Sequence, residues 1–350
     1  MKRHKHLFEQ MASLENLLAA SEDALRGKRM KPAAARYLIG MEKEVFALHE
    51  ELHSGSYRHG PYHYFMIHEP KLRRVAAACF RDRVVHHALV RVLEPLFEPR
   101  FIEDSFACRP GKGTHAGMRR AAEFAQRFPY ALKCDVKKYF PSIHQGILMK
   151  QVSRVIGDAR VLAVVAEVLG SHTDSVRRLW PEGGGLFDMQ EERYGLPIGN
   201  LTSQFLANVY LNEFDHFVKH ELRVKGYVRY VDDFILFGHD RATLRATLRA
   251  QGRAVREKLQ ELRLTIHPDK YHLGPTRCGV DFTGFIVFAD GRIRLRKANV
   301  RRFTLRYRQM RHEAKRGRMD WPEVRQQVRS WIAHAAHAHS HRLRADILLG

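Results

Sequence analysis

The chain has 350 residues, of which 45% are hydrophobic and 28% are charged. These values are typical of a globular protein with two or three subdomains, and they argue against a disordered or membrane-embedded chain. The 60 Lys and Arg residues outnumber the 38 Asp and Glu residues, which gives a net charge of +22. The last 60 residues hold 16 Lys and Arg against 4 Asp and Glu, or +12 of this surplus. A surplus of this size favours a polyanionic partner, most often nucleic acid.

Targeting and redox signals are weak. The basic start, MKRHKHLFEQ, runs into no apolar signal core, and the most apolar stretch, residues 161–170, is too short to span a bilayer. The four cysteines are far apart and form no CxxC pair, so their spacing predicts neither a zinc site nor a disulfide. We expect a cytoplasmic protein with no membrane partner.

The first third of the chain predicts helices followed by two strands. Residues 7–52 carry apolar residues at three- and four-residue spacing, which is typical of amphipathic helices. After a turn, YHYFMIHEP and KLRRVAAACF predict short strands, and RDRVVHHALVRVLEPLFEPRF returns to the helical period.

The middle of the chain predicts a strand, a helix and a hairpin. PYALKCDVKKYFPSI, residues 129–143, is expected to form a strand ending in acids and aromatics, with a long helix over 146–169 and an irregular loop over 171–195. Residues 203–222 are predicted to be helical. YVRYVDDFILF predicts a hairpin with two acids at its tip.

The last part predicts a helix over 240–263, strands within LTIHPDKYHL, CGVDFTGFIVF and GRIRL, and a basic helical tail. If the tail is one helix there, His334, His337 and His341 share a face. Without a nearby acid or cysteine, packing or RNA contact is favoured over metal binding. Because strand pairs are interrupted by helices rather than alternating as βαβ units, the fold class is α+β.

Three acids carry the strongest chemical signal. Asp135 ends one apolar strand, and Asp232 and Asp233 lie in the predicted hairpin. If these strands are neighbours, three carboxylates meet at one end of a sheet, which requires neutralisation by divalent cations. Two Mg²⁺ ions held by shared aspartates would also clamp the attacking hydroxyl and the leaving pyrophosphate of an in-line phosphoryl transfer.

With their surroundings, these acids resemble the motifs of bacterial reverse transcriptases. LKCDVKKYFPSI, LPIGNLTSQFLAN, YVDD, LTIHPDK and VDFTGF resemble the five palm blocks in the family's order, over roughly residues 60–290. Upstream, KLRRVAAACFRDRVVHHAL and DSFACRPGKGTH resemble fingers blocks. The resemblance implies a right-hand polymerase fold with an N-terminal helical extension (1–60), fingers (61–134), a palm with an antiparallel sheet (135–290, with fingers-like helical insertions around 146–195) and a small basic helical thumb (291–350).

The resemblance also implies roles for individual residues. Two Mg²⁺ ions, with Mn²⁺ as an alternative, would be held by Asp135, Val136, Asp232 and Asp233. Lys270, in the fourth block, would protonate the leaving pyrophosphate. The residues implied in nucleotide binding are Lys71, Arg73, Arg109, Phe140, Ile198 and Gly199. A ring at Phe140 would clash with a 2′-hydroxyl and so select deoxynucleotides.

The second block departs from the general family pattern, which has Gln-Gly and ends in Ser-Pro. This chain has Ile198-Gly199 and ends in Ser203-Gln204. IGNLTSQ is similar to the reverse transcriptases of diversity-generating retroelements, which copy a template RNA with frequent errors at adenines and work with a small basic accessory protein. Ile198 cannot make the hydrogen bond of a Gln, which predicts low fidelity.

Several alternatives stay open. A retron-like or antiphage-defence reverse transcriptase, using a noncoding RNA, would share the chemistry. A catalytically silent RNA-binding protein is disfavoured by the intact acids, and an RNA-dependent RNA polymerase by Phe140. Partners are expected to be template RNA, the RNA/cDNA duplex and dNTPs. We expect no ribonuclease H, endonuclease or large maturase module.

Overall fold

The computed structural model describes residues 3–68, 72–179, 190–249 and 254–349. The chain forms two compact units, each built from separate stretches of sequence. The first unit comprises residues 1–102, 136–217 and 257–265, and the second comprises 103–135, 218–256 and 266–350.

The first unit begins with helices, as the periodicity predicted. They are α1 (Phe8–Ala12), α2 (Leu14–Leu25), α3 (Pro32–Ile39), α4 (Met41–Ser54) and α5 (Phe80–Phe97). Ser13 separates α1 from α2 because it is the N-cap of α2, where its Oγ accepts a hydrogen bond from the Asn16 backbone N–H at 3.1 Å. Leu17 and Leu48, on α2 and α4, are fully buried.

A two-stranded hairpin lies between α4 and α5. Strands β1 (His63–Ile67) and β2 (Arg73–Ala77) pair antiparallel, with Phe65 opposite Val75. Both strands were predicted from their β-rich composition. All five residues of β1 are exposed, so neither face of this strand is buried against a hydrophobic core.

The region 146–169 forms two helices, and the prediction of one long helix is wrong. Helix α7 (Tyr139–Ser142) precedes α8 (Gln145–Val155) and α9 (Ala159–Gly170). The break occurs because Asp158 caps α9, accepting hydrogen bonds from the backbone N–H groups of Arg160 (3.0 Å) and Val161 (3.3 Å).

The loop predicted over 171–195 is also wrong within the described residues. β4 (Ser175–Leu179) and β5 (Gln190–Tyr194) pair antiparallel. Their sequences, SVRRL and QEERY, show no apolar alternation, so the periodicity gave no strand signal. Long polar side chains interact across the pair instead, with Arg178 Nε 3.5 Å from Glu191 Oε1 and the Arg177 guanidinium over the Tyr194 ring. Helix α10 (Leu201–His216) follows.

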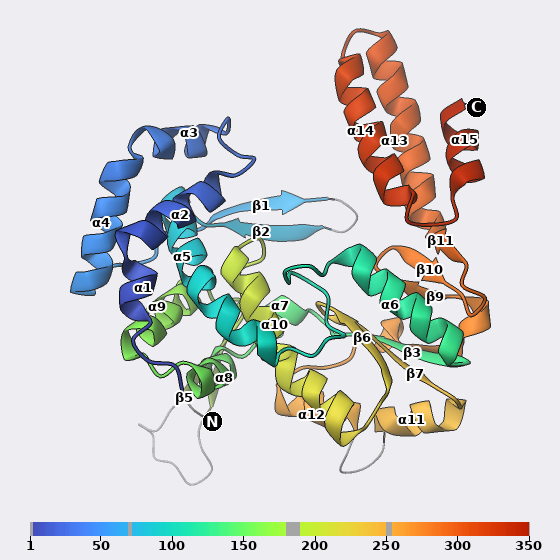
Figure 1. Cartoon of the computed structure of the whole chain (residues 1–350), viewed down its shortest axis with the longest axis horizontal. Helices are drawn as coiled ribbons and strands as arrows, with labels where there is room; N and C mark the ends of the chain where they lie inside the picture. Colours follow the sequence, from blue (N-terminus) through green and yellow to red (C-terminus); the bar gives the residue numbers. More distant parts are fainter. Residues whose placement is uncertain (1–2, 69–71, 180–189, 250–253, 350) are drawn as a thin grey trace. The chain divides into compact units, whose positions relative to one another are not determined.

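The second unit is built around a four-stranded antiparallel sheet with the order β6-β7-β3-β8. Its strands are β3 (Tyr130–Asp135), β6 (Gly226–Tyr230), β7 (Asp233–Gly238) and β8 (His272–Pro275). Helix α6 (Thr114–Arg127) crosses this unit beside the sheet (Figure 1) and shares a core with it, in which Met118 and Phe124 pack with Ile235 and Phe237. The predicted hairpin of β6 and β7 is confirmed.

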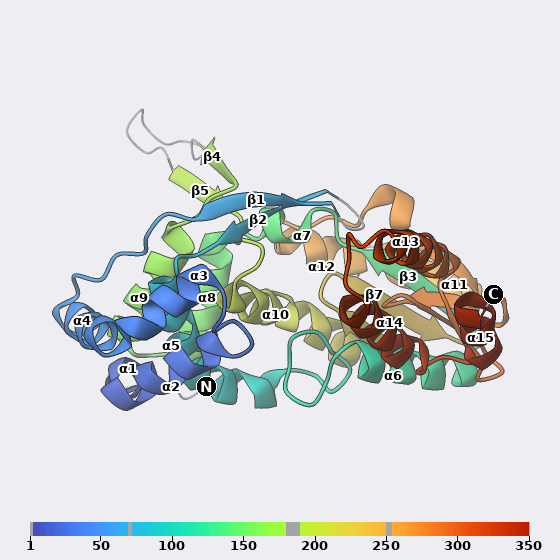
Figure 2. The same cartoon turned by 90° about the horizontal axis from the view of Figure 1, so that it is seen from above.

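A second sheet and the C-terminal helices complete this unit. β9 (Val280–Phe282), β10 (Phe285–Val287) and β11 (Ile293–Leu295) form a three-stranded antiparallel sheet. Helices α13 (Lys297–Lys315), α14 (Trp321–Ala335) and α15 (His341–Leu349) lie side by side in both views (Figures 1 and 2). The Phe303 ring stacks on Trp331 at 4.0 Å between α13 and α14.

The three histidines predicted on one helix face are divided, so that prediction is wrong. Helix α14 ends at Ala335, and His341 begins α15. The chain turns between them, where Ser340 Oγ donates to the Ala335 carbonyl and the His339 backbone N–H donates to the Ile293 carbonyl. His337 instead stacks on His115 of α6 at 3.6 Å.

The remaining elements are short. They are α11 (Arg241–Arg249), α12 (Val255–Glu261), the 3₁₀ segments η1 (Glu98–Arg100), η3 (Pro268–Lys270) and η4 (Thr276–Cys278), and the π-helical η2 (Phe217–Glu221). None of the helices in the described ranges combines the length and the apolarity needed to cross a bilayer.

Candidate active site

The tip of the β6–β7 hairpin is a strained turn. Val231 has a φ of 55°, which is uncommon for a β-branched residue and costs free energy. Arg229 stabilises the turn, because its Nη1 donates to the Val231 carbonyl at 3.0 Å. Its side chain is almost completely buried. The backbone of Arg229 also pairs with residues 104–106. Sequence reasoning missed this residue, since a buried Arg in a strand has no distinctive local signal.

Pairing between β3 and β7 brings the predicted acids together. Asp135 is directly opposite Asp233, and Asp232 precedes Asp233 at the hairpin tip. Opposed residues of an antiparallel pair have Cβ atoms only about 5 Å apart. The backbone carbonyl of Asp135 accepts from the His267 N–H at 2.7 Å, which ties the end of β3 to the segment that carries Lys270.

The surroundings penalise the charged forms of two of these acids. Burial raises the pKa of Asp232 to about 6, and the negative charges of Asp135 and Asp233 add to the shift. Burial also raises the pKa of Asp233, and the charge of Lys133 partly offsets this rise. The cluster therefore has more negative charge than its own surroundings neutralise.

Two lysines provide the local compensation. Lys270 Nζ lies 2.5 Å from Asp135 Oδ1, and Lys133 Nζ lies 3.1 Å from Asp233 Oδ2. Lys270 was predicted, and Lys133 was missed. The signal for Lys133 was present in LKCD, because residues two apart on a strand share a face, so Lys133 lies on the same side of the sheet as Asp135.

The acids supply the oxygen donors that Mg²⁺ prefers. Asp233 Oδ1 is buried without a hydrogen-bond partner, so one carboxylate oxygen of the cluster remains available. In the described part of the chain, no three His, Cys, Asp or Glu side chains are grouped at metal-binding spacing. The donor set fits a divalent ion that takes over the role of those lysines.

Arg109 lies elsewhere in the second unit, in the loop before α6. Its Nη1 donates to the Ser105 carbonyl at 2.8 Å and to Ser105 Oγ at 2.7 Å. Ser105 in turn forms a parallel bridge with Arg229. Arg109 is thus connected to the strand that supports the hairpin tip.

The other predicted residues belong to the first unit, where residues 196–200 join three of them. The Leu196 N–H donates to the Phe140 carbonyl at 3.0 Å, and the Ile198 carbonyl accepts from the Ala76 N–H at 2.9 Å. Phe140, Ile198 and strand β2, which carries Arg73, are therefore linked through one hydrogen-bonded segment. Val136 is buried directly after Asp135 in the chain. Lys71 lies outside the described residues.

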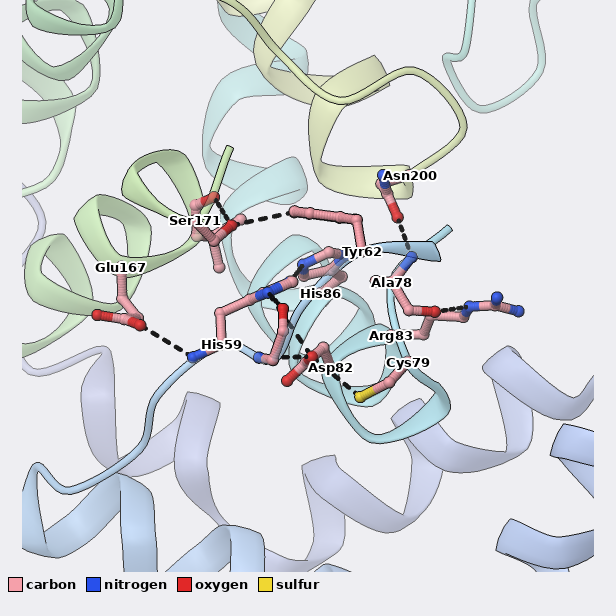
Figure 3. Close-up of polar contacts among 12 residues, drawn as sticks. His59, Tyr62, Ala78, Cys79, Asp82, Arg83, His86, Glu167, Ser171 and Asn200 are labelled. Atoms are coloured by element: carbon pink, nitrogen blue, oxygen red, sulfur yellow. Dashed lines mark hydrogen bonds and ion pairs between the residues drawn. The ribbon is translucent and has the colours of Figure 1, made fainter. Parts of the chain in front are cut away.

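Asn200 clamps the end of β2 and was also missed. Its Nδ2 donates to the Ala76 carbonyl at 2.8 Å, and its Oδ1 accepts from the Ala78 N–H at 3.4 Å, the contact drawn in Figure 3. The Asn200 amide thus makes the hydrogen bonds to the β2 backbone that a neighbouring strand would otherwise make. The result is a fixed connection between the second palm block and the β1–β2 hairpin.

A buried polar cluster fixes the same, open end of this hairpin to α5 (Figure 3). Asp82 accepts hydrogen bonds from the Tyr57 hydroxyl at 2.9 Å and the Gly60 N–H at 3.0 Å. It also accepts one from Cys79 Sγ at 3.0 Å, which Figure 3 shows. His59 Nε2 lies 3.1 Å from His86 Nε2 within the same cluster. These contacts hold the chain before β1 and after β2 on one helix.

Replacing Gly199 by Ala is expected to destabilise the first unit by about 1–3 kcal/mol. Gly199 has a φ of +110°, and a Cβ there would lie 2.7 Å from Val75 Cγ1. Chemical denaturation of the two proteins measures the difference. Gly40→Ala is the matched control, because Gly40 has a φ of −104° and a Cβ added there would meet no atom within 4 Å. Equal effects of the two substitutions would contradict the predicted clash.

Comparison with known proteins identifies the family. The family model described as reverse transcriptase (RNA-dependent DNA polymerase) matches residues 67–287. This range includes the acids, both lysines and the segment 196–200.

Individual relatives agree with the family. Protein YkfC of Escherichia coli is 28% identical over 281 residues, covering 69% of this chain and 70% of that protein. The group II intron-encoded protein LtrA of Lactococcus lactis is 24% identical, covering 51% of this chain and 28% of LtrA. Nuclear intron maturase 1 of Arabidopsis thaliana is 31% identical, covering 28% of this chain and 14% of the maturase.

Among solved structures, telomerase from Candida albicans bound to a fragment of telomeric RNA aligns with a TM-score of 0.46 and 13% identity, covering 72% of this chain and 51% of that one. The family match spans more than half of the chain, and the helices and antiparallel sheets have the mixed content of a right-hand polymerase fold. The chain belongs to the reverse transcriptase family, the RNA-dependent DNA polymerases.

Proposed function

We propose that this chain copies an RNA template into DNA at the tip of the β6–β7 hairpin, where Asp135, Asp232 and Asp233 are the catalytic acids. The observation that carries the proposal is the register of β3 and β7, which places Asp135 opposite Asp233. A buried carboxylate cluster of this kind favours bound cations, and in-line phosphoryl transfer needs cations near the attacking and leaving oxygens.

Dependence on divalent metal ions is general to the family. In this chain, Asp135, Asp232, Asp233 and the Val136 carbonyl would hold the ions, with Mg²⁺ as the expected metal and Mn²⁺ as the alternative. When bound, the ions would stabilise the charge that develops on the reacting phosphoryl group. Lys270 and Lys133 would then be free to act on other groups.

The remaining roles belong to the chain's own side chains. Lys270, beside Asp135, is proposed to donate a proton to the departing pyrophosphate. Lys71 and Arg73 are proposed to bind the triphosphate, and Arg109 the template or nucleotide. Phe140 is proposed to exclude ribonucleotides by contact with the 2′ position.

The activity is tested by primer extension on a defined RNA template with all four dNTPs. We expect deoxynucleotide addition that stops when a chelator is added and resumes with excess Mg²⁺ or Mn²⁺. Extension that persists in the chelator, or that occurs without template, would contradict the proposal.

We further propose that the chain serves a diversity-generating retroelement, together with a small basic accessory protein that forms an oligomer. The support is the block IGNLTSQ and the basic C-terminal region. Sequencing the RNA and cDNA that copurify with the protein tests this. Substitutions scattered at template adenines and matching a nearby gene support it. A fixed repeat or a branched cDNA would instead indicate a retron-like or antiphage-defence enzyme.

Replacing Ile198 by Gln is expected to lower misincorporation at template adenines several-fold. A Gln side chain offers a polar contact that a wrongly paired nucleotide would fail to satisfy, whereas Ile offers none. Deep sequencing of cDNA made in vitro from one template measures the spectrum. Ile198→Leu, which adds no polar group, is the control. An unchanged spectrum in the Gln variant would refute the link between Ile198 and fidelity.

A further inference from the structure

Asp104 is a buried acid of the second unit that is not one of the proposed catalytic acids. It lies in the loop before α6 and is only 3% exposed. Arg120 Nε, on α6, lies 2.7 Å from Asp104 Oδ1, and Lys219 Nζ, on η2, lies 2.8 Å from Asp104 Oδ2. Both carboxylate oxygens are therefore held by cations from two different elements. A buried ion pair adds little net stability over packed apolar side chains, but its directional contacts fix where its members lie.

The backbone of Asp104 pairs with β6, the strand that leads into the hairpin tip. The Asp104 carbonyl accepts from the Arg229 N–H at 2.9 Å, and the Phe106 N–H donates to the Arg229 carbonyl at 3.0 Å. This stretch thus lies beside β6 as a short parallel neighbour. Lys219 adds a contact at the start of β6, because its Nζ also donates at 3.2 Å to the carbonyl of Lys225, the residue before the strand. The ion pairs of Asp104 therefore restrain β6 near both of its ends.

Arg229 connects this restraint to the hairpin tip. Its Nη1 donates to the carbonyl of Val231, which has a φ of 55°. A residue strained in this way keeps its conformation only while its surroundings hold it. Asp232 and Asp233 follow directly in the chain. Because Mg²⁺ requires oxygen ligands at about 2.0–2.1 Å in a nearly octahedral arrangement, a small displacement of these carboxylates weakens its binding.

We propose that Asp104 is a positioning residue that holds the β6–β7 hairpin tip in the geometry needed to bind a divalent cation. Its ion pairs with Arg120 and Lys219 fix the backbone at residue 104. That backbone fixes Arg229, and Arg229 fixes the turn at Val231. The inference rests on the proposed function, because it takes the acids at the tip to be those that hold the metal ions of the reaction.

The test measures Mg²⁺ binding by the full chain without RNA or dNTPs, from the rise in Tm as Mg²⁺ is added at pH 8 to protein freed of metal by chelator. Asp104→Asn keeps the shape of the side chain and removes its charge. Stabilisation by a ligand depends on its concentration relative to the dissociation constant (Kd), so Kd can be compared between proteins of unequal stability. A merely structural role of Asp104 would lower the starting Tm and leave the Kd for Mg²⁺ unchanged.

Glu123→Gln is the matched control. Glu123 is exposed on α6 and pairs with the same arginine, its Oε2 lying 2.8 Å from Arg120 Nη1. The substitution removes one negative charge from the same unit and leaves the Asp104 carboxylate in place. It therefore measures how much the loss of one charge, acting at long range, weakens cation binding.

We expect Asp104→Asn to bind Mg²⁺ about 10-fold more weakly than the wild type, the effect typical of losing a residue that supports metal ligands. Primer extension by this variant should be slow at low Mg²⁺ and should recover at a concentration about 10-fold higher. Glu123→Gln should change the Kd less than about 2-fold.

Lys219→Gln is the second variant, and it carries the test if Asp104→Asn does not fold. It leaves the ion pair between Asp104 and Arg120 in place, and the Lys219 side chain is 23% exposed, so the variant is expected to fold. Its Kd for Mg²⁺ should rise about 3-fold, because one of the two ion pairs remains.

An unchanged Kd in Asp104→Asn, or in Lys219→Gln if only that variant folds, would overturn the proposal. Equal weakening by Asp104→Asn and Glu123→Gln would overturn it as well, because loss of charge alone would then explain the effect. The outcome is separable from the proposed activity. A wild type that extends primers, with an Asp104→Asn variant that binds Mg²⁺ equally well, refutes the positioning role alone. A wild type that gains no stability from Mg²⁺ and extends no primer refutes the proposed function itself.

Discussion

Replacing Asp232 by Asn is expected to stabilise the metal-free protein at pH 8 while reducing RNA-templated DNA synthesis at least about 100-fold. The two effects share one cause. Asp232 has to be charged to bind a cation, and without the cation that charge is held in a buried site beside Asp135 and Asp233. The Asn side chain carries no charge. The variant is therefore expected to lose both the free-energy cost of holding that charge in the site and the ability to bind the cation.

The pH dependence follows from the direction of the shift. The pKa of Asp232 is raised from 3.8 to about 6 in the folded protein. Between these values the folded state keeps a proton that the unfolded chain has lost, so stability decreases as the pH rises through this window. Above pH 6 the full penalty applies, on the order of 3 kcal/mol at about 1.4 kcal/mol for each pKa unit.

Thermal unfolding in chelator at pH 4 and pH 8 measures this effect. The Tm of Asp232→Asn should exceed that of the wild type by several degrees at pH 8, and the two Tm values should be nearly equal at pH 4. Adding Mg²⁺ at pH 8 should stabilise the wild type and leave the variant unchanged.

Asp240→Asn is the control, because Asp240 is an exposed acid of the same unit whose pKa is lowered by the hydrogen bond from the Thr243 N–H. The Tm of Asp240→Asn in chelator at pH 8 should not exceed that of the wild type. A wild type more stable than Asp232→Asn in chelator at pH 8 would contradict the electrostatic account of the site.

Replacing Phe140 by Ala is expected to reduce discrimination against ribonucleotides about 10- to 100-fold. The ring is half-buried in α7, and its backbone is fixed by the Leu196 N–H, so the substitution removes bulk without releasing the chain. The ratio of kcat/KM for a dNTP to that for the matching NTP measures the effect. The change should come mainly from a rise in kcat/KM for the NTP.

Phe140→Tyr keeps the ring and should keep the discrimination. If Phe140→Ala discriminates as well as the wild type, the ring does not contact the sugar and is an ordinary packing residue. Because Tyr139 beside it is buried and the two rings lie 5.6 Å apart, unfolding curves of both variants should accompany the kinetics.

The sequence was sufficient to predict the hairpin that carries Asp232 and Asp233 at its tip. YVDD lies between two β-rich runs, and alternation and turn position leave little freedom in how such a segment folds. That Asp135 would meet Asp233 followed only from the family resemblance, because strand order depends on contacts between distant segments. The register of β3 with β7 provides the physical reason.

Other features had no usable local signal. Arg229 supports the turn at Val231 from within a strand, and only the folded structure shows that its side chain is buried. Strands β4 and β5 pair antiparallel although SVRRL and QEERY show no apolar alternation, so periodicity gave no signal for them. In contrast, Asp158 follows Gly157 directly before an apolar helix, and its capping role was readable from the sequence.

The most direct test of the central claim is primer extension on RNA by the double variant Asp232→Ala/Asp233→Ala. The matched control, Asp240→Ala/Asp290→Ala, removes two exposed acids of the same unit. We predict that the wild type and the control extend the primer in Mg²⁺ with dNTPs, and that the double variant adds no nucleotide although it still binds RNA. Full extension by the double variant would contradict the assignment of the hairpin tip as the catalytic centre.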